Sequence, residues 1–177
     1  MAKEPTDTTP ETDENAAALS QGAAATEAEA EQPLVVNAQY IKDLSFEAPT
    51  TPTIFAMMQQ EKPDIQVNID CRAEPLQDRV FEVVLEIKGE CTVGESTAFV
   101  AEISYAGVFT VNVPDEHRQP VLLIECPRLI FPFARAVLAD VTRDGGFPPL
   151  MLGPVDFVAM YRNTLERMAA EKGEAES

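Results

Sequence analysis

Residues 81–88 read Phe-Glu-Val-Val-Leu-Glu-Ile-Lys, and this stretch decides the fold class. All four odd-numbered positions are apolar, whereas Glu or Lys occupies three of the four even-numbered ones. Successive side chains of a β-strand point to opposite faces, so the alternation predicts a strand with one buried and one solvated face. A strand of that kind is typical of an antiparallel sheet.

The period of two recurs on both sides of this stretch and changes to about 3.6 after residue 125. Further strands are predicted at residues 40–47, 65–72 and 97–111. A first helix is expected to begin at Pro132, a residue tolerated in a first helical turn, and to end at Gly145. Asp156 is placed to cap a second helix, after an apolar loop at 147–154. These elements predict an α+β fold in which a four-stranded antiparallel sheet carries two C-terminal helices on one face.

The composition divides the chain into one folded domain and two tails. Residues 1–33 contain one leucine, no valine, isoleucine or aromatic residue, and eight acids. Such a segment buries too little apolar surface to offset the entropy of ordering it, so we expect a disordered acidic tail. Residues 171–177 have no apolar side chain larger than alanine, and a second disordered tail is expected there. The folded domain is therefore expected at residues 34–170.

The charge and the apolar pattern argue against several classes of partner. The chain carries 30 acidic and 13 basic side chains, and its formal net charge of −17 repels nucleic acid and anionic lipid surfaces. The sequence has no apolar run long enough to span a membrane and no secretory signal. We therefore expect a cytoplasmic protein without membrane insertion.

Motifs for catalysis or metal binding are missing from the sequence. The three cysteines are widely spaced and are interpreted as buried thiols. His117 has polar neighbours and is expected in a solvated loop. Asp43 and Glu47 would lie about 13 Å apart along a strand, which is too far for a catalytic carboxylate pair. We expect no catalytic residue, metal or cofactor, and so no enzyme.

Four blocks of sequence carry a family resemblance. They are Tyr-Ile-Lys-Asp-Leu-Ser-Phe-Glu-Ala-Pro at 40–49, Thr-Ala-Phe-Val-Ala-Glu at 97–102, Cys-Pro-Arg-Leu-Ile-Phe-Pro-Phe-Ala-Arg at 126–135, and Gly-Phe-Pro-Pro-Leu-Met-Leu-Gly-Pro-Val-Asp-Phe at 146–157. The blocks keep their order and approximate spacing from residue 40 to about residue 161. Together they resemble SecB, the family of bacterial protein-export chaperones.

The resemblance implies a function and its partners. A SecB-like chain forms a homotetramer, built as a dimer of dimers, that holds unfolded precursor proteins without ATP and delivers them to SecA, the motor of the Sec translocase. Such a protein needs no catalytic residue, because binding only the unfolded state shifts the folding equilibrium by mass action. Two alternatives stay open: a SecB-like chaperone dedicated to an antitoxin, and a small enzyme that uses a carboxylate pair.

The resemblance also implies three sets of site residues. The client-binding groove is expected to be lined by Phe55, Ile65, Val67, Leu150, Leu152, Phe157 and Tyr161. SecA binding is assigned to Asp43, Glu47, Val100 and Glu102, and the contact between dimers to Ala101, Ile103 and Tyr105. The residue types alone leave open whether Phe157 and Ile65 belong to the groove or to the core. A tryptophan of the family is replaced here, and Met57 or Met58 is expected in its place.

Overall fold

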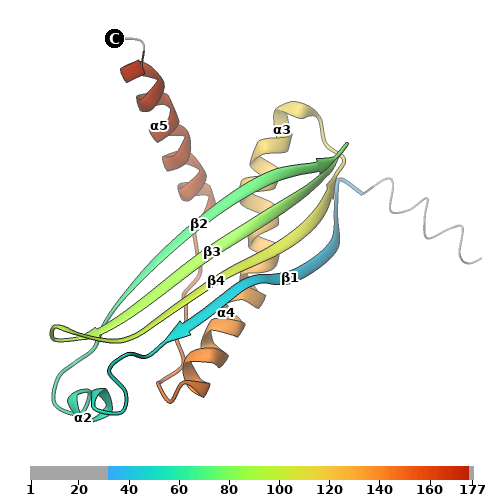
Figure 1. Ribbon diagram of the computed structural model, residues 1–177. Helices are drawn as coiled ribbons and strands as arrows, with labels where there is room; N and C mark the ends of the chain where they lie inside the picture. The colour runs from blue at the N-terminus through green and yellow to red at the C-terminus, as the bar shows by residue number, and fades with distance from the viewer. Residues whose placement is uncertain (1–31, 176–177) are drawn as a thin grey trace, which may run out of the picture. The chain divides into compact units, whose positions relative to one another are not determined.

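Four antiparallel strands form one sheet in the order β1-β4-β3-β2, so that β1 and β2 are its two edges (Figure 1). The strands are β1 (Leu34–Glu47), β2 (Asp64–Gln77), β3 (Val80–Val93) and β4 (Ser96–Val111). The four-stranded sheet and the α+β class predicted from the sequence are confirmed. Each strand is longer than its alternating stretch, because the pairing between neighbours continues past the residues that alternate.

The computed structural model describes residues 32–175, with side chains described as far as Arg167. The predicted disordered tail at residues 1–33 lies outside this range, apart from its last two residues. At the other end, helix α5 (Phe157–Ala175) continues past residue 171. The expected start of a disordered C-terminal tail therefore falls inside a helix, and residues 176–177 lie outside the described range.

The alternation in β3 and β4 separates a buried inner face from a polar outer face. The inner side chains are almost fully buried, and they include Phe81, Val83, Leu85, Ile87, Phe99, Ala101, Ile103 and Phe109. The register places Glu82, Glu86 and Lys88 of β3 on the opposite face, together with Glu102 of β4. Strand β3, which contains residues 81–88, therefore has an apolar inner face and a mainly charged outer face.

One long helical run covers the inner face of the sheet, in place of the short helix expected from Pro132. The run consists of α3 (Asp115–Pro120), the π-helical turn η1 (Val121–Glu125) and α4 (Cys126–Asp144). The expected helix start at Pro132 and the expected loop around His117 are therefore wrong. Pro127 has no N–H to donate to the carbonyl of Leu123, four residues earlier, and the wider π turn at that carbonyl accommodates the proline ring.

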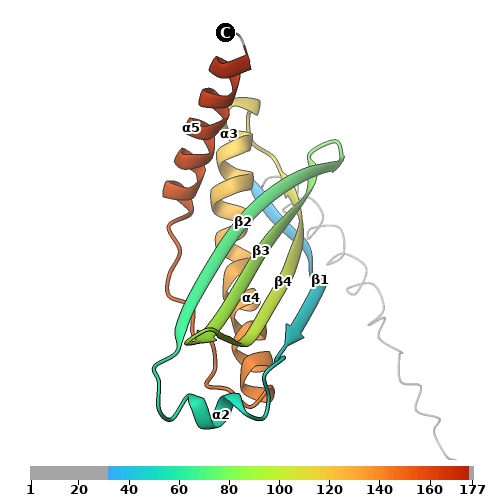
Figure 2. The same cartoon turned by 60° about the vertical axis from the view of Figure 1, so that its left-hand side comes forward.

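Helix α4 packs closely on the inner face and lies behind the strands in both views of the chain (Figures 1 and 2). Gly107 of β4 permits this close packing. A Cβ atom at that position would lie 2.6 Å from the Phe109 ring and 3.1 Å from Ile130 of α4. The hydrophobic core therefore fills the space between α4 and the inner face.

Helix α5 begins where the sequence predicts. The Asp156 carboxylate accepts a hydrogen bond of 3.0 Å from the Ala159 amide and so caps the helix. Phe157 packs edge-on against Phe131 of α4, with ring centroids 5.9 Å apart. From this contact α5 runs beside η1, near the edge of the sheet that β2 forms (Figures 1 and 2).

Between β1 and β2 the chain crosses from one edge of the sheet to the other. This crossing segment, residues 48–63, contains the short helix α2 (Ile54–Met57) and passes the end of the sheet where β3 turns into β4 (Figure 1). Ile54 is fully buried, and the Phe55 ring lies 5.1 Å from that of Phe147. The crossing segment therefore lies next to the loop at 147–154.

Candidate functional site

An apolar groove with a volume of about 530 Å³ lies between β2, the end of the crossing segment and the loop before α5. None of the described residues that line it carries a charge; they are Met58, Pro63, Ile65, Val67, Ile69, Cys91, Phe99, Pro148, Pro149, Leu150, Met151, Leu152, Gly153 and Pro154. Ile65 is 48% exposed, Val67 38% and Met151 76%. Apolar side chains with this exposure at the edge of a sheet are typical of a surface that binds another chain.

The groove is open because the helices leave the apolar face of β2 uncovered. Ile65 and Val67 pair with Cys91 and Gly89 of β3, so they lie on the same inner face as the core residues of that strand. Helix α4 packs mainly on β4 and β3, however, and does not shield the β2 edge in the same way. The same alternation thus gives a buried face on β3 and an accessible apolar face on β2.

Two buried side chains fix the loop at 147–154 to the sheet. The Phe147 ring lies 5.0 Å from the ring of Phe99 and packs against Phe55 as well. Leu150 is 6% exposed and rests directly on the backbone of Gly89. A Cβ atom at residue 89 would lie 2.6 Å from Leu150 Cδ2, so the glycine provides the space that Leu150 occupies. Leu150 therefore lies against β3 in the wall of the groove.

Acidic side chains gather on the outer face, where β1 and β4 lie side by side. The register pairs Glu47 with Val100, and it places Asp43 and Glu102 on the same face of these two strands. Glu90 pairs with Val100 from the β3 side. The four residues Asp43, Glu47, Val100 and Glu102 therefore form one continuous surface, which we call the acidic patch.

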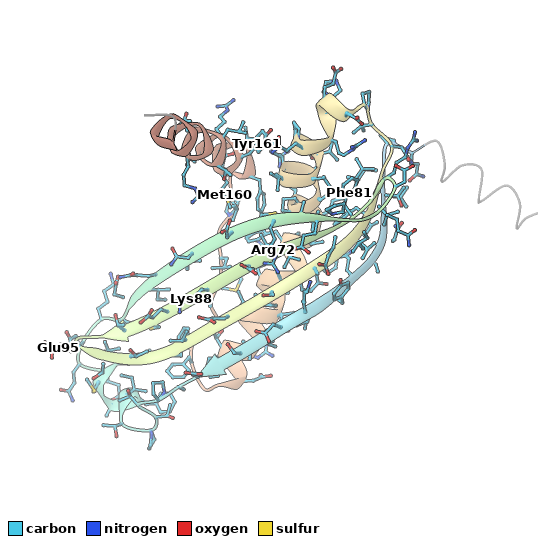
Figure 3. The ribbon with its side chains drawn as sticks, turned by 45° about the horizontal axis from the view of Figure 1, so that its top comes forward. Arg72, Phe81, Lys88, Glu95, Met160 and Tyr161 are labelled. Atoms are coloured by element: carbon cyan, nitrogen blue, oxygen red, sulfur yellow. The ribbon has the colours of Figure 1, made fainter. Side chains whose placement is uncertain are left out.

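A basic side chain, Lys88, lies beside the acidic patch, on the face of the sheet turned away from α4 (Figure 3). Its Nζ atom is 2.6 Å from Glu102 Oε1. The hydrogen bond to Glu102 and the nearby charges of Glu102, Glu90 and Glu47 raise the pKa of Lys88. Both partners of the ion pair are nearly half exposed, so water screens the interaction and it contributes little to stability.

A second ion pair on the outer face joins β1 to β3 across β4. The carboxylate of Glu82 is 9% exposed, lies 2.6 Å from Lys42 Nζ and accepts a hydrogen bond from the Tyr40 hydroxyl. The hydrogen bonds from Lys42 and Tyr40 hold the pKa of Glu82 below its ordinary value, and Glu82 in turn raises the pKa of Tyr40. These three side chains fix the edge strand β1 to the middle of the sheet.

We expect Glu82→Gln to lower the free energy of unfolding by about 2 kcal/mol at pH 7, because it removes the charge from two partly buried hydrogen bonds. The pKa of Glu82 is lower in the folded state, so its contribution is present above the ordinary pKa of a glutamate and is lost as the pH falls through the folded value. Urea unfolding at pH 7 and at about pH 4 measures both effects. The control is Glu74→Gln, an exposed position on the same face. Equal losses in the two variants at pH 7 would contradict the role of Glu82.

Comparison with known proteins identifies the family. A family model described as preprotein translocase subunit SecB matches residues 27–168. The protein-export protein SecB of Rhodospirillum rubrum is 56% identical over 134 residues, which cover 76% of this chain and 83% of that protein. The chain belongs to the SecB family. The SecB of Paramagnetospirillum magneticum is 51% identical over 142 residues, which cover 80% of this chain and 92% of the other.

A solved structure supports the fold. A SecB-like chaperone of Mycobacterium tuberculosis, solved in complex with a peptide from an antitoxin, superimposes with a TM-score of 0.59, and the match covers 70% of this chain and 91% of the other. At 11% sequence identity, this superposition shows a shared fold and nothing beyond it. As a member of the SecB family, the chain is a chaperone for protein export, and SecB is not a family of enzymes.

The structure brings together four of the seven groove residues expected from SecB. Ile65, Val67, Leu150 and Leu152 line the groove. The other three, Phe55, Phe157 and Tyr161, are not among the described residues that line it. Phe55 packs under Phe147, Phe157 is 2% exposed against Phe131, and the Tyr161 hydroxyl is within 3.5 Å of Gln119 on α3. Figure 3 shows Tyr161 near the start of α5, on the side of the helix close to α3.

Of the two methionines expected in place of the family tryptophan, Met58 lines the groove and Met57 is not among the described residues that line it. Other groove residues were not expected from the sequence. Pro63 and Phe99 also contribute, although neither belongs to the loop or to the alternating part of β2. The signal that could have found Pro63 is its place in the crossing segment just before β2.

The residues assigned to the contact between SecB dimers lie in the hydrophobic core of the single chain. Ala101, Ile103 and Tyr105 are at most 8% exposed in the single chain, because α4 packs over them. They offer little surface to a second chain. Phe133 of α4, which stacks on the Tyr105 ring at 6.4 Å, is 50% exposed, and Leu129 one turn earlier is 43% exposed.

The side chains most often used in catalysis or metal binding are dispersed in this SecB chain. Burial raises the pKa of Cys71 and Cys126 to about 12, which keeps both thiols protonated. His117 is exposed, as expected, but on helix α3. Within the described residues, no three His, Cys, Asp or Glu side chains come together as ligands for a metal ion. Between residues 32 and 175, no helix is both long and apolar enough to cross a lipid bilayer.

Proposed function

We propose that this chain is an ATP-independent cytoplasmic chaperone that holds unfolded precursor proteins in the apolar groove and presents them to SecA through the acidic patch. The observation that carries the proposal is the accessible groove beside the β2 edge, lined without a charged side chain. The family gives the export role, and the groove supplies a physical means of holding an unfolded chain without bond-making chemistry.

The groove suits an extended polypeptide of variable sequence. In the described part of the chain β2 pairs with β3 alone, so its outer edge presents backbone N–H and C=O groups. An extended client segment can pair with that edge and place alternate side chains on Ile65 and Val67. Backbone pairing does not depend on the client sequence, and Met58 and Met151 have flexible thioether side chains that adapt to different shapes. We infer broad selectivity for unfolded chains.

The expected affinity of one groove is modest. Covering the exposed parts of Ile65 and Val67 contributes about 1 kcal/mol each, since full burial of such side chains gives about 1.5–3 kcal/mol. Ordering the client segment opposes this gain. Tight capture therefore calls for several grooves acting on one long client, as in an oligomer.

The acidic patch supports the proposed docking of SecA. Its carboxylates repel an acidic partner and attract a basic one, which gives fast association that weakens as salt is added. Val100 lies between Glu47 and Glu90 and supplies a central apolar contact. The patch is on the outer face and the groove on the inner one, so docking does not require the surface that holds the client.

The test is whether the purified chain arrests the refolding of a slow-folding precursor in the absence of nucleotide. Arrest is expected when the chain is present in molar excess, and unchanged refolding would contradict the chaperone role. Calorimetry of SecA binding at low and high salt then distinguishes an export chaperone from a SecB-like chaperone dedicated to an antitoxin. Absence of SecA binding at low salt would remove the export role and leave the holding activity.

We expect the chain to form a tetramer, with a mass by light scattering of about four times 19.3 kDa. The reason is the exposed apolar surface of β1 and α4, where Ile41 is 45% exposed, Leu44 39% and Phe133 50%. The tetramer should dissociate when Phe133 is changed to Glu, whereas Arg128→Glu, on the same helix, should leave the mass unchanged. A monomer at micromolar concentration contradicts the prediction.

A further inference from the structure

The hydroxyl of Thr142 connects α4 to the groove. Thr142 is fully buried in the last turn of the helix. Its Oγ1 atom donates a hydrogen bond to the Leu138 carbonyl at 2.8 Å and accepts one from the Leu150 amide at 2.9 Å. The Thr142 carbonyl also accepts a hydrogen bond of 3.1 Å from the Phe147 amide. One residue of α4 thus holds the loop at two points, once through its backbone and once through its side chain.

The side-chain bond acts on the part of the loop that lines the groove. Leu150 lies in the groove wall and rests on Gly89, whereas Phe147 is held independently by the aromatic rings around it. Pro148 and Pro149 separate these two anchors and have no N–H to donate. The position of Leu150 therefore depends on its own amide, and the partner of that amide is the Thr142 hydroxyl.

We propose that Thr142 is a positioning residue of the client-binding groove, whose hydroxyl keeps Leu150 seated against β3. The proposal rests on the proposed function of the groove. Without the hydroxyl, the Leu150 amide is left buried and unpaired, which is costly. The loop relieves this cost by moving until the amide reaches water, and that movement lifts Leu150 from Gly89 and alters the wall that holds the client.

The test compares Thr142→Val with Thr142→Ser in the full-length chain. Valine has nearly the shape of threonine but no hydroxyl, and serine keeps the hydroxyl. Hydrogen exchange is followed by mass spectrometry in the segment 148–154, where only Leu150, Met151, Leu152 and Gly153 carry amide protons. Client dissociation is followed with a labelled unfolded precursor, and SecA binding and the thermal midpoint are measured in parallel.

We expect Thr142→Val to speed both the exchange of the Leu150 amide and client dissociation by about 10-fold, as for the loss of one buried hydrogen bond. Thr142→Ser should restore both rates to within about 2-fold of the parent chain. SecA affinity should stay unchanged in both variants, because the acidic patch lies on the other face. A general loss of stability would move the thermal midpoint and all readouts together.

Two results overturn the assignment. The first is a Thr142→Val chain in which the exchange rate of the Leu150 amide and the rate of client dissociation equal those of the parent chain. The second is a Thr142→Ser chain that behaves like the valine variant. A parent chain that captures no client overturns the proposed function itself and this assignment with it. The parent chain is measured in the same series, so the two failures are distinguishable.

Discussion

The Glu102→Lys chain should bind SecA at least about 100-fold more weakly than the parent chain at low salt, and capture unfolded precursor equally well. The substitution removes a carboxylate of the acidic patch, whose Oε1 atom lies 2.6 Å from Lys88 Nζ, and puts a second cation next to Lys88. The two neighbouring cations repel each other and any basic partner surface. The groove on the opposite face is untouched, so capture should not change. Calorimetry with SecA and a refolding-arrest assay measure the two activities.

The matched control for this prediction is Glu116→Lys on α3. It changes the net charge by the same amount at a position 77% exposed and outside the acidic patch. If binding depends on the patch, the control should weaken SecA binding by no more than about 3-fold, the part due to long-range attraction. Equal losses in the two variants would assign binding to overall charge. Loss of capture in a tetrameric Glu102→Lys chain would show that the two surfaces are not separate.

Gly89→Val should reduce client capture by at least about 10-fold and leave SecA binding intact. The new side chain points inward, where even a Cβ atom would lie 2.6 Å from Leu150 Cδ2. Leu150 must move out of the space next to residue 89, and the loop moves away from β3 with it. Valine is a favourable strand residue, so the sheet itself should tolerate the change. The measurement is the concentration of chaperone that arrests half of the refolding of a slow-folding precursor.

Gly153→Ala is the control for Gly89→Val. Gly153 belongs to the same loop and lines the same groove, but a Cβ atom there meets nothing within 4 Å. Capture by this control should be unchanged. Wild-type capture by Gly89→Val, with SecA binding also normal, would show that Leu150 does not shape the client site.

The sheet could be predicted because its sequence pattern and its burial have the same cause. In 81–88 the four odd-numbered side chains are buried on the inner face, whereas the even-numbered positions carry Glu82, Val84, Glu86 and Lys88, of which only Glu86 and Lys88 reach water. Three of these four outer residues are charged, so the period of two is visible without coordinates. The helical run from α3 to α4 was harder to predict from the sequence. Pro120, Pro127 and Pro132 each indicate a break when taken singly, whereas the π turn and the position of Pro127 near the start of α4 allow the helix to continue.

Strand alternation predicts the face of the sheet on which a residue lies, but not which other element covers that face. Alternation places Glu102 and Ala101 on opposite faces, as the structure has them. It cannot tell that α4 buries Ile103 while leaving Ile65 exposed, because that difference comes from the position of a helix far along the chain. Phe157 illustrates the same point, since its helical spacing suits both a groove and a core.

The back-to-back arrangement of groove and acidic patch has a kinetic consequence. A single layer of backbone, β3 and β4, separates Leu150 on one side from Lys88 and Glu102 on the other. Under the proposed function, a bound client therefore leaves the SecA-docking surface free, and a ternary complex can assemble before the client dissociates. Transfer through such a complex would avoid releasing the client into bulk water, where it would fold or aggregate.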